Sequence, residues 1–271
     1  MTGEASFREA NLGRTGPWGG RLGLAASYGA PAAAFEAAFE RGCNYFYLGS
    51  GRRRAEMRRA VAELCRRGLR DRIVVAVQTY ARWGFLAEPV FARRLGAMGL
   101  DRADVLVLGW HNRAPSRRLL DAAARLREKG LCRFLALSGH NRSLFARLAA
   151  DGVFDLFHVR YNAAHRGAET EVFPALRGED RPGLVSYTAT RWGHLLAAKK
   201  MPAGEAPLSA TDCYRFVLTR PEVDVCLCGP KNMQEMQTAL AALDGGPLSG
   251  EEMARARRIG DHVRARGGFF M

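Results

Sequence analysis

The sequence predicts a single (β/α)8 barrel that covers residues 1–271, and three observations lead to this fold class. Short apolar runs alternate with amphipathic segments of helical length, which is typical of a parallel sheet covered by helices. Eight such runs occur, as many as the strands of this barrel. A length of 271 residues is also usual for an α/β barrel that forms one domain.

The eight expected strands are short runs of mostly apolar residues. Strands of a parallel sheet are covered on both faces, so their sequences read as continuous Val, Leu, Ile and Phe. Residues 1–20, before the first run, are expected to form an irregular lead-in. In chain order the expected strands are Gly23–Ala26, Tyr45–Leu48, Ile73–Gln78, Asp104–Leu108, Phe134–Ser138, Leu156–Val159, Gly183–Tyr187 and Val225–Cys228.

The expected helices follow the strands and carry apolar residues at helical spacing. Gly42 after the first helix and Gly130 after the fourth suit helix ends, because glycine adopts the left-handed conformation there without strain. The last helix has no strand after it and is an extra C-terminal helix. In chain order the expected helices are Ala30–Arg41, Arg53–Arg67, Pro89–Leu95, Arg117–Glu128, Arg142–Ala150, Thr170–Leu176, Thr211–Thr219, Asn232–Ala242 and Glu251–Arg264.

The composition argues against a nucleic-acid or membrane partner. The net charge of +14 comes mainly from arginine, since 37 of the 41 basic residues are Arg. Many of these arginines lie on the expected outer helix faces, and no basic stripe is interleaved with aromatic residues, so we expect no nucleic-acid partner. No apolar run reaches 18 residues and the N-terminus lacks the apolar core of a signal peptide, so we expect no membrane association.

The cysteines indicate the compartment and argue against a metal site. The six Cys are scattered along the chain and form no CxxC pair. Neither a zinc site nor a disulfide framework is therefore indicated. We expect no bound metal, buried free thiols and a cytoplasmic location, where thiols stay reduced.

Three of the expected strands are followed by polar clusters. The stretches Asp104–Asn112, Arg133–Asn141 and Asp155–Asn162 each begin as an apolar run and end in polar residues that include Asn. Ligands of such folds bind beyond the carboxyl ends of the strands, so these clusters are expected on one rim. His111 and His140 are candidate proton-transfer groups there, since histidine titrates near neutral pH. The alternative is that each His-Asn pair only begins the next helix as an N-cap.

Several motifs make the chain resemble the aldo/keto reductase family over nearly its whole length. Their order and spacing together carry the resemblance. The resemblance implies a (β/α)8 barrel and a nicotinamide cofactor, usually NADPH, that lies across the rim. The matching motifs are Leu12–Gly16, Leu22–Leu24, Gly42–Phe46, Leu137–Asn141, Val159–Asn162, Arg215–Leu218, Pro221, Val223–Val225 and Cys228–Asn232.

The resemblance also assigns cofactor contacts. It implies that Ser138 hydrogen-bonds the nicotinamide carboxamide, with Asn141 and His140 on the same loop able to share that role. Tyr187 matches the aromatic residue that stacks on the nicotinamide ring.

The adenosine end of the cofactor falls, by the same resemblance, on the loop from Gly229 through Lys231 to Asn232, which would receive the 2′-phosphate. A helix N-terminus beside a lysine attracts phosphate. The family often has an arginine five residues beyond this lysine, where Met236 stands, so Lys231 would distinguish NADPH from NADH largely alone.

The catalytic positions depart from the family. The resemblance implies carbonyl reduction by hydride transfer, with a tyrosine as the acid. In that family a lysine and an aspartate set the pKa of the tyrosine, and a histidine orients the carbonyl. The resemblance places Tyr47 at the aspartate, Arg52 at the tyrosine, Gln78 at the lysine and Gly109 at the histidine. Arginine cannot donate a proton near neutral pH, and glutamine supplies no positive charge.

Other residues at the expected rim are candidates for the missing proton transfer. Tyr47, Tyr80, His111 and His140 all fall at expected rim positions. A cation such as Arg52 beside Tyr47 would lower the pKa of the tyrosine. The alternative for Tyr47 is an aromatic residue that packs at the end of a strand.

The leading hypothesis is a divergent aldo/keto reductase-like protein: an NADP(H)-binding oxidoreductase that acts on a small molecule with Tyr47, His111 and His140 as non-standard acid and base residues. One alternative is a catalytically inactive barrel, a pseudoenzyme, that keeps the cofactor site. The other is an enzyme of another class that uses rim His and Tyr side chains for proton transfer without hydride. The sequence does not name the substrate.

Overall fold

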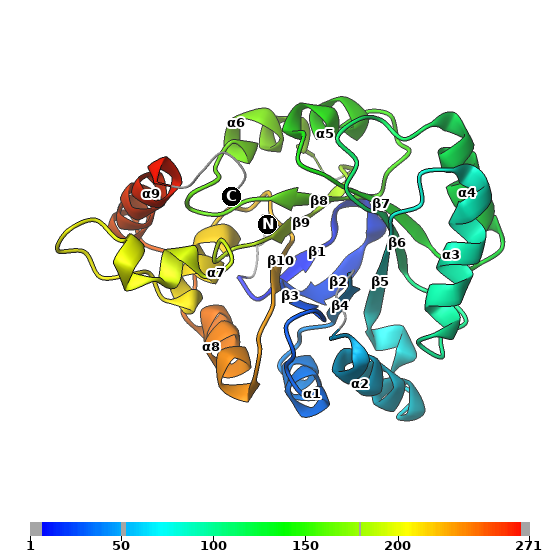
Figure 1. Cartoon of the computed structure of the whole chain (residues 1–271), viewed down its shortest axis with the longest axis horizontal. Coiled ribbons are helices and arrows are strands. Elements are labelled where there is room, and N and C mark those ends of the chain that lie inside the picture. The colour runs from blue at the N-terminus through cyan, green and yellow to red at the C-terminus, as the bar shows by residue number, and fades with distance from the viewer. Residues whose placement is uncertain (1–6, 50–52, 179, 267–271) are drawn as a thin grey trace, which may run out of the picture.

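The predicted (β/α)8 barrel is confirmed by the computed structural model, which describes residues 7–49, 53–178 and 180–266. Eight parallel strands close on themselves in the order β10-β3-β4-β5-β6-β7-β8-β9, and helices surround them (Figure 1). The strands are β3 (Leu22–Ala25), β4 (Tyr45–Leu48), β5 (Val74–Thr79), β6 (Val105–Leu108), β7 (Phe134–Ser138), β8 (Leu156–Arg160), β9 (Gly183–Tyr187) and β10 (Val225–Cys228).

The helices follow the strands as the sequence predicts, and the extra C-terminal helix is present. They are α1 (Ala32–Glu40), α2 (Ala55–Arg66), α3 (Gly84–Gly96), α4 (Arg117–Glu128), α5 (Arg142–Ala149), α6 (Ala168–Glu171), α7 (Ala210–Leu218), α8 (Met233–Asp244) and α9 (Gly250–Ala265). None of the helices within the described ranges is long and apolar enough to cross a membrane.

Two helices differ from their predicted bounds by more than two residues, and a proline lies in each of the two regions. The expected helix over 170–176 is instead the short α6 followed by a 3-10 helix, Phe173–Ala175, since Pro174 lacks the N–H that would continue an α-helix. Helix α3 begins five residues before Pro89 and runs through it. Pro89 therefore lies inside the helix rather than at its start.

The expected irregular lead-in is wrong for residues 9–20. Strands β1 (Glu9–Asn11) and β2 (Pro17–Gly20) pair as an antiparallel hairpin, which crosses the barrel in Figure 1. Between them Leu12 is buried among the residues that fill the barrel, and the N–H of Arg14 donates to the carbonyl of Arg181, just before β9. The hairpin therefore covers the amino-terminal end of the barrel. Residues 1–6 lie outside the described part of the chain.

Alternate residues of each strand face the barrel axis, as the pleat of a strand requires. On β4, Tyr45 and Tyr47 pack among the residues that fill the barrel, whereas Leu48 packs under the surrounding helices. On β5, Ala76 faces inward and Val77 outward. Parallel register between β4 and β5 pairs Tyr47 with Ala76 and Leu48 with Val77. This alternation decides which side chains reach the mouth of the barrel.

Three aspartates fix the amino-terminal ends of the strands. Each stands immediately before a strand and accepts a hydrogen bond from a backbone N–H of the preceding strand in the barrel. A carboxylate satisfies a donor that the ladder leaves free, and charge-assisted bonds of this kind are strong. The three bonds are Asp104 to Val75 at 2.8 Å, Asp155 to Leu135 at 2.8 Å and Asp224 to Leu184 at 2.7 Å.

Candidate functional site

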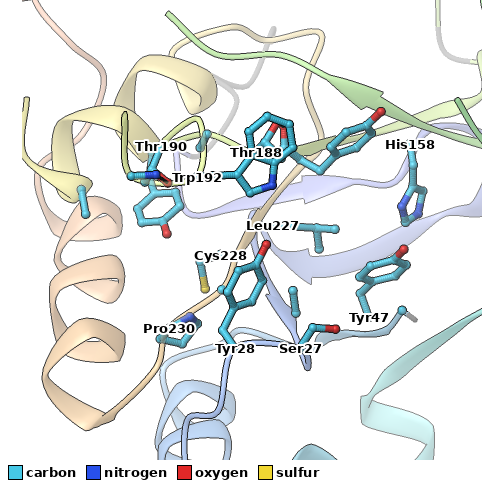
Figure 2. A pocket seen from close by; sticks show the side chains of 18 of the residues that line it. Ser27, Tyr28, Tyr47, His158, Thr188, Thr190, Trp192, Leu227, Cys228 and Pro230 are labelled. Atoms are coloured by element: carbon cyan, nitrogen blue, oxygen red, sulfur yellow. Dashed lines mark hydrogen bonds between the residues drawn. The ribbon is translucent and has the colours of Figure 1, made fainter. Parts of the chain in front are cut away.

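A cavity of about 600 Å³ opens at the carboxyl ends of the strands. Its size falls in the range of small-molecule and cofactor sites. It runs from the barrel centre, at Tyr47 and His158, to Pro230 (Figure 2). Lys231, just before the N-terminus of α8, also lines it. Residues at or near the ends of seven strands line it: Ala25, Tyr47, Gln78, Ser138, His158, Tyr187 and Leu227.

Tyr47 and Gln78 form a hydrogen-bonded pair at the floor of the cavity. The Tyr47 hydroxyl donates to Oε1 of Gln78 at 2.5 Å. Burial raises the pKa of Tyr47 well above its usual value, which is opposite to the lowered pKa that the sequence led us to expect. Arg52, the cation expected to lower it, lies outside the described residues. Tyr47 is therefore protonated at neutral pH, and its proton is engaged by Gln78.

Gly109 makes room for Gln78. A Cβ atom at position 109 would lie 2.7 Å from Cγ of Gln78, which is closer than real Cβ contacts. A larger residue at this position would push the glutamine side chain away from Tyr47. The glycine and the glutamine are thus sterically coupled.

His158 is a site residue that the sequence reasoning missed. Its imidazole lies on the barrel axis, with the Nε2 atom 2.9 Å from the Tyr45 hydroxyl and the ring centroid 5.2 Å from that of Tyr47. Burial lowers the pKa of His158 to about 3, so the ring is neutral at pH 7. The available signal was the alternation of β8, which gives Leu156 and His158 the same inward face.

One side of the cavity is built from Tyr187, His140 and Trp110. The Tyr187 hydroxyl donates to the carbonyl of Gly139 at 2.8 Å and lies 3.1 Å from Nδ1 of His140. Burial raises the pKa of Tyr187 to about 12, while burial and, second, Arg160 lower the pKa of His140. Both groups are therefore neutral at pH 7 and act as hydrogen-bonding partners rather than charges.

His111, which the sequence predicts as a catalytic residue, makes its side-chain contact away from the cavity. His111 is buried outside the cavity lining, and its Nε2 atom lies 2.7 Å from Nη1 of Arg82. Burial and, second, Arg82 lower the pKa of His111 to about 4. Arg82 also donates to the carbonyls of Gly109 and Trp110, so it holds the whole β6–α4 loop.

Two residues predicted to contact the cofactor, Asn141 and Asn232, lie outside the cavity lining. The Asn141 side chain donates to the carbonyl of Asn112 at 3.1 Å and joins two loops away from the cavity lining. The Asn232 side chain accepts from the N–H of Glu235 at 2.8 Å and is the N-cap of α8. These are the side-chain and cap contacts that asparagine commonly makes at helix starts.

Tyr161 does not reach the cavity, although the end of β8 places its backbone at the same rim. Its ring is buried under the helices, stacked on Phe216, and its hydroxyl donates to Glu169 at 2.7 Å. The inward residues of β8 are His158 and Arg160 because side chains alternate along the strand. Tyr80, in contrast, does line the cavity.

The adenosine end of the expected cofactor site already holds a carboxylate. Lys231 Nζ lies 4.0 Å from a carboxylate oxygen of Glu235, and the backbone N–H of Lys231 donates to Glu235 at 2.9 Å. Both residues line the cavity. A 2′-phosphate bound here would meet the helix N-terminus and Lys231, which attract it, and also Glu235, which repels it.

The loop after β9 forms the roof of the cavity in a strained conformation. Thr188, Arg191 and Trp192 all have positive φ angles, of 62°, 50° and 53°. Non-glycine residues with positive φ cluster at functional sites, where the surrounding structure holds them in place. Here Arg191 is fully buried and donates to the carbonyl of Val263 at the end of α9, while Trp192 faces the cavity (Figure 2).

The thiols and acidic groups do not form a metal centre in the part of the chain that the structure describes. No cluster of three or more His, Cys, Asp or Glu residues there could hold a metal ion. Cys226 and Cys228 share the outward face of β10, as their spacing predicts, and both are buried. All six cysteines are free.

Comparison with known proteins supports the fold. No family model and no curated protein matches this sequence. Solved aldo-keto reductases superpose over most of the chain. One from Klebsiella pneumoniae, in complex with NADPH, has a TM-score of 0.75 and 20% identity over 94% of this chain and 95% of its own.

Two further structures agree. A second Klebsiella pneumoniae aldo/keto reductase, in complex with NADP and acetate, has a TM-score of 0.74 and 19% identity over 94% of this chain and 96% of its own. The holo form of an aldo-keto reductase from Bacillus halodurans has a TM-score of 0.76 and 17% identity over 93% of this chain and 96% of its own. The fold of this chain is therefore the (β/α)8 barrel of the aldo-keto reductases.

Proposed function

We propose that the protein binds a nicotinamide dinucleotide in this cavity and is an oxidoreductase for acceptors that need no strong general acid. The observation that carries the proposal is the single cavity that runs from Tyr47 at the barrel centre to Lys231 at the N-terminus of α8. An elongated ligand with a reactive ring at one end and phosphates toward the other matches this shape. A solved structure with this fold contains NADPH.

Different residues of the cavity would bind the two ends of the cofactor. Ser138 and His140 offer hydrogen bonds at the inner end, and Tyr187 offers an aromatic face there. At the other end, Gly229 opens the loop to α8, whose N-terminus favours negative charge. The bound cofactor supplies a hydride. Its preferred form in this proposal is NADP(H), because Lys231 is the cation at that end.

Tyr47 and Gln78 orient the acceptor rather than protonate it. Tyr47 keeps its proton because burial raises its pKa, and that proton is shared with Gln78. Proton transfer to a developing alkoxide needs an acid whose pKa lies near the working pH. An acceptor already activated for hydride, such as a quinone, avoids this requirement. His158, neutral and hydrogen-bonded to Tyr45, supplies no proton either.

Two alternatives weigh less. The non-redox enzyme needs a base at the rim, but His111 lies outside the cavity lining and the pKa of His158 is lowered to about 3. The inactive barrel remains the second candidate, because the Tyr47 proton is engaged by Gln78. Six free cysteines support a reducing, cytoplasmic compartment for either redox candidate.

Turnover of NADPH with 1,4-benzoquinone tests the proposal. We expect the protein to accelerate NADPH oxidation above the rate without protein. Tyr187→Ala should weaken NADPH binding about fivefold, because an aromatic stacking partner contributes about 1 kcal/mol beyond its buried area. Ser186→Ala, one residue away on the outward face of β9, is the matched control. A rate equal to that without protein would leave the inactive barrel as the better description.

The preference for NADPH over NADH should change in opposite directions when the charge of Glu235 or that of Lys231, both at the start of α8, is removed. Glu235→Gln removes a negative charge beside the 2′-phosphate position, and we expect the preference for NADPH over NADH to rise about threefold to tenfold. Lys231→Ala should narrow that preference. Glu251→Gln, in the first turn of α9, is the control for the same charge change.

Isothermal titration calorimetry with both cofactors gives the two affinities for each variant. Equal affinities for NADPH and NADH in the unaltered protein would show that Lys231 does not read the 2′-phosphate.

A further inference from the structure

A second cleft, of about 340 Å³, lies outside the barrel between α2 and α3. Its floor is formed by Leu48 and Val77, which point away from the barrel axis. Their chain neighbours Tyr47 and Gln78 point the opposite way, into the main cavity. The two spaces therefore lie on opposite sides of the ends of β4 and β5. Three apolar residues of the α3 region, Val90, Ala97 and Met98, complete the floor.

Four arginines surround this cleft, and none of the described residues that line it is acidic. Arg54 and Arg58 come from the α2 side, and Arg93 and Arg94 come from α3. Within the described ranges, no carboxylate lies within ion-pair distance of any of the four. Other helix arginines have such partners: Arg66 pairs with Glu63 at 2.6 Å farther along the same α2. The cleft thus brings together four arginines that have no carboxylate partner among the described residues.

Arg94 is the member of the group that most needs a partner. Its Nη1 atom is buried and makes no hydrogen bond within the described residues. Burial and, second, the charge of Arg54 lower the pKa of Arg94, because two like charges share the space. Arg54 Nη1 donates to the carbonyl of Gly49 at 3.0 Å, which fixes its position. A buried donor without an acceptor is unfavourable, and an anionic ligand in the cleft would satisfy it.

We propose that the cleft between α2 and α3 binds the phosphate group of a small organic phosphate. A phosphate monoester carries close to two negative charges and three acceptor oxygens, which matches several converging guanidinium groups. Arginine presents a planar fork of donors that fits phosphate oxygens two at a time. The apolar floor then receives the organic part. The cleft is a compact concavity, whereas a nucleic-acid surface would present an extended basic stripe with aromatic platforms.

The full chain titrated with inorganic phosphate and with phenyl phosphate tests this site by calorimetry. We expect one saturable site for each compound, with phenyl phosphate tighter because its ring covers the apolar floor. The double variant Arg93→Gln/Arg94→Gln should lose about a hundredfold in affinity, at about tenfold for each charged hydrogen bond. The matched control is Arg118→Gln/Arg125→Gln on α4, which changes the net charge equally and should keep the affinity.

Three outcomes would overturn the proposal. Equal losses in the two double variants would show attraction by net charge alone. Loss of phosphate binding in Lys231→Ala would place the site at α8. Binding of a single-stranded oligonucleotide without binding of either phosphate compound would identify a polyanion surface instead. Because the proposal does not involve hydride transfer, it stands or falls independently of the proposed oxidoreductase function.

Thermal melting keeps the test valid if a variant is less stable. Phosphate should raise the melting temperature of the unaltered protein and of the α4 control, since a ligand that binds only the folded state stabilises it. The Arg93→Gln/Arg94→Gln variant should fold, because removing two unpaired like charges relieves repulsion, and its melting temperature should not respond to phosphate. A response equal to that of the unaltered protein would contradict the site.

Discussion

Reduction of simple aldehydes and ketones by this protein with NADPH should be about a thousandfold slower than in a typical enzyme, near 0.01 per second. A positioned general acid contributes about a hundredfold to ten-thousandfold in rate, and oxyanion stabilisation a comparable factor. Here Tyr47 is protonated but bonded to Gln78, and Gly109 offers no side chain to orient a carbonyl. A general acid and a group that stabilises the oxyanion act together, so the rate factors lost with each should not simply multiply.

The pH dependence of the residual rate should be flat between about pH 6 and 8. His158 and His111 have pKa values lowered to about 3 and about 4, so both rings stay neutral throughout that range. The pKa of Tyr187 is raised to about 12 and that of Tyr47 is raised as well, so both hydroxyls stay protonated. No group in this set changes its charge near neutrality.

The measurement is NADPH oxidation with a panel of aldehydes and ketones, for the unaltered protein and for Tyr47→Phe. We expect rates near background in both. Turnover at an ordinary enzymatic rate would contradict the argument that the acid function is lost. If that turnover collapsed in Tyr47→Phe, Tyr47 would be identified as the general acid.

Replacing Asp224 with Ala should lower the free energy of unfolding by about 3–5 kcal/mol, the usual cost of breaking a buried ion pair. Asp224 accepts two hydrogen bonds from Arg181, at 2.9 and 2.5 Å, and one from the N–H of Leu184 at 2.7 Å. Burial raises the pKa of Asp224, and the bonds to Arg181 oppose that change. Without the carboxylate, the buried Arg21 and the half-buried Arg181 would lose the negative charge that opposes their mutual repulsion.

Urea unfolding followed by circular dichroism checks this effect. The control is Asp121→Ala, which removes an exposed pair with Arg117 on α4 and should cost at most about 1 kcal/mol. Asp224→Asn should fall between the two, because an amide can still accept from Leu184. Equal stabilities for Asp224→Ala and Asp121→Ala would show that the carboxylate does not hold the start of β10.

The strands could be predicted from sequence because burial on both faces leaves a clear signal. The bounds of β4, β7, β9 and β10 agree with the apolar runs that predicted them. The hairpin over residues 9–20 could not be predicted in this way. Its strands are short and rich in polar residues and glycine, and what stabilises it is contact with β9, far away in the sequence.

The sequence could predict a residue of the candidate site only where its place at the end of a strand is enough to bring it into the cavity. Tyr47, Ser138 and Tyr187 end strands or nearly so, and the structure places all three in the cavity. His111 could not be assigned, because Arg82 from another loop holds it outside the cavity lining. His158 was hidden inside an apolar run, and only the alternation of inward and outward residues distinguishes it.

Titration with NADPH, followed by tryptophan fluorescence, tests the central claim that the cavity holds a nicotinamide dinucleotide. Trp110 and Trp192 both line the cavity, so a bound cofactor should quench them. We expect saturable quenching at one site, with a dissociation constant in the micromolar range, which corresponds to a binding free energy of about −8 kcal/mol. In Trp192→Phe the amplitude of the quenching should be smaller. No quenching and no calorimetric heat with NADPH up to about a millimolar, an affinity of about −4 kcal/mol, would contradict the claim.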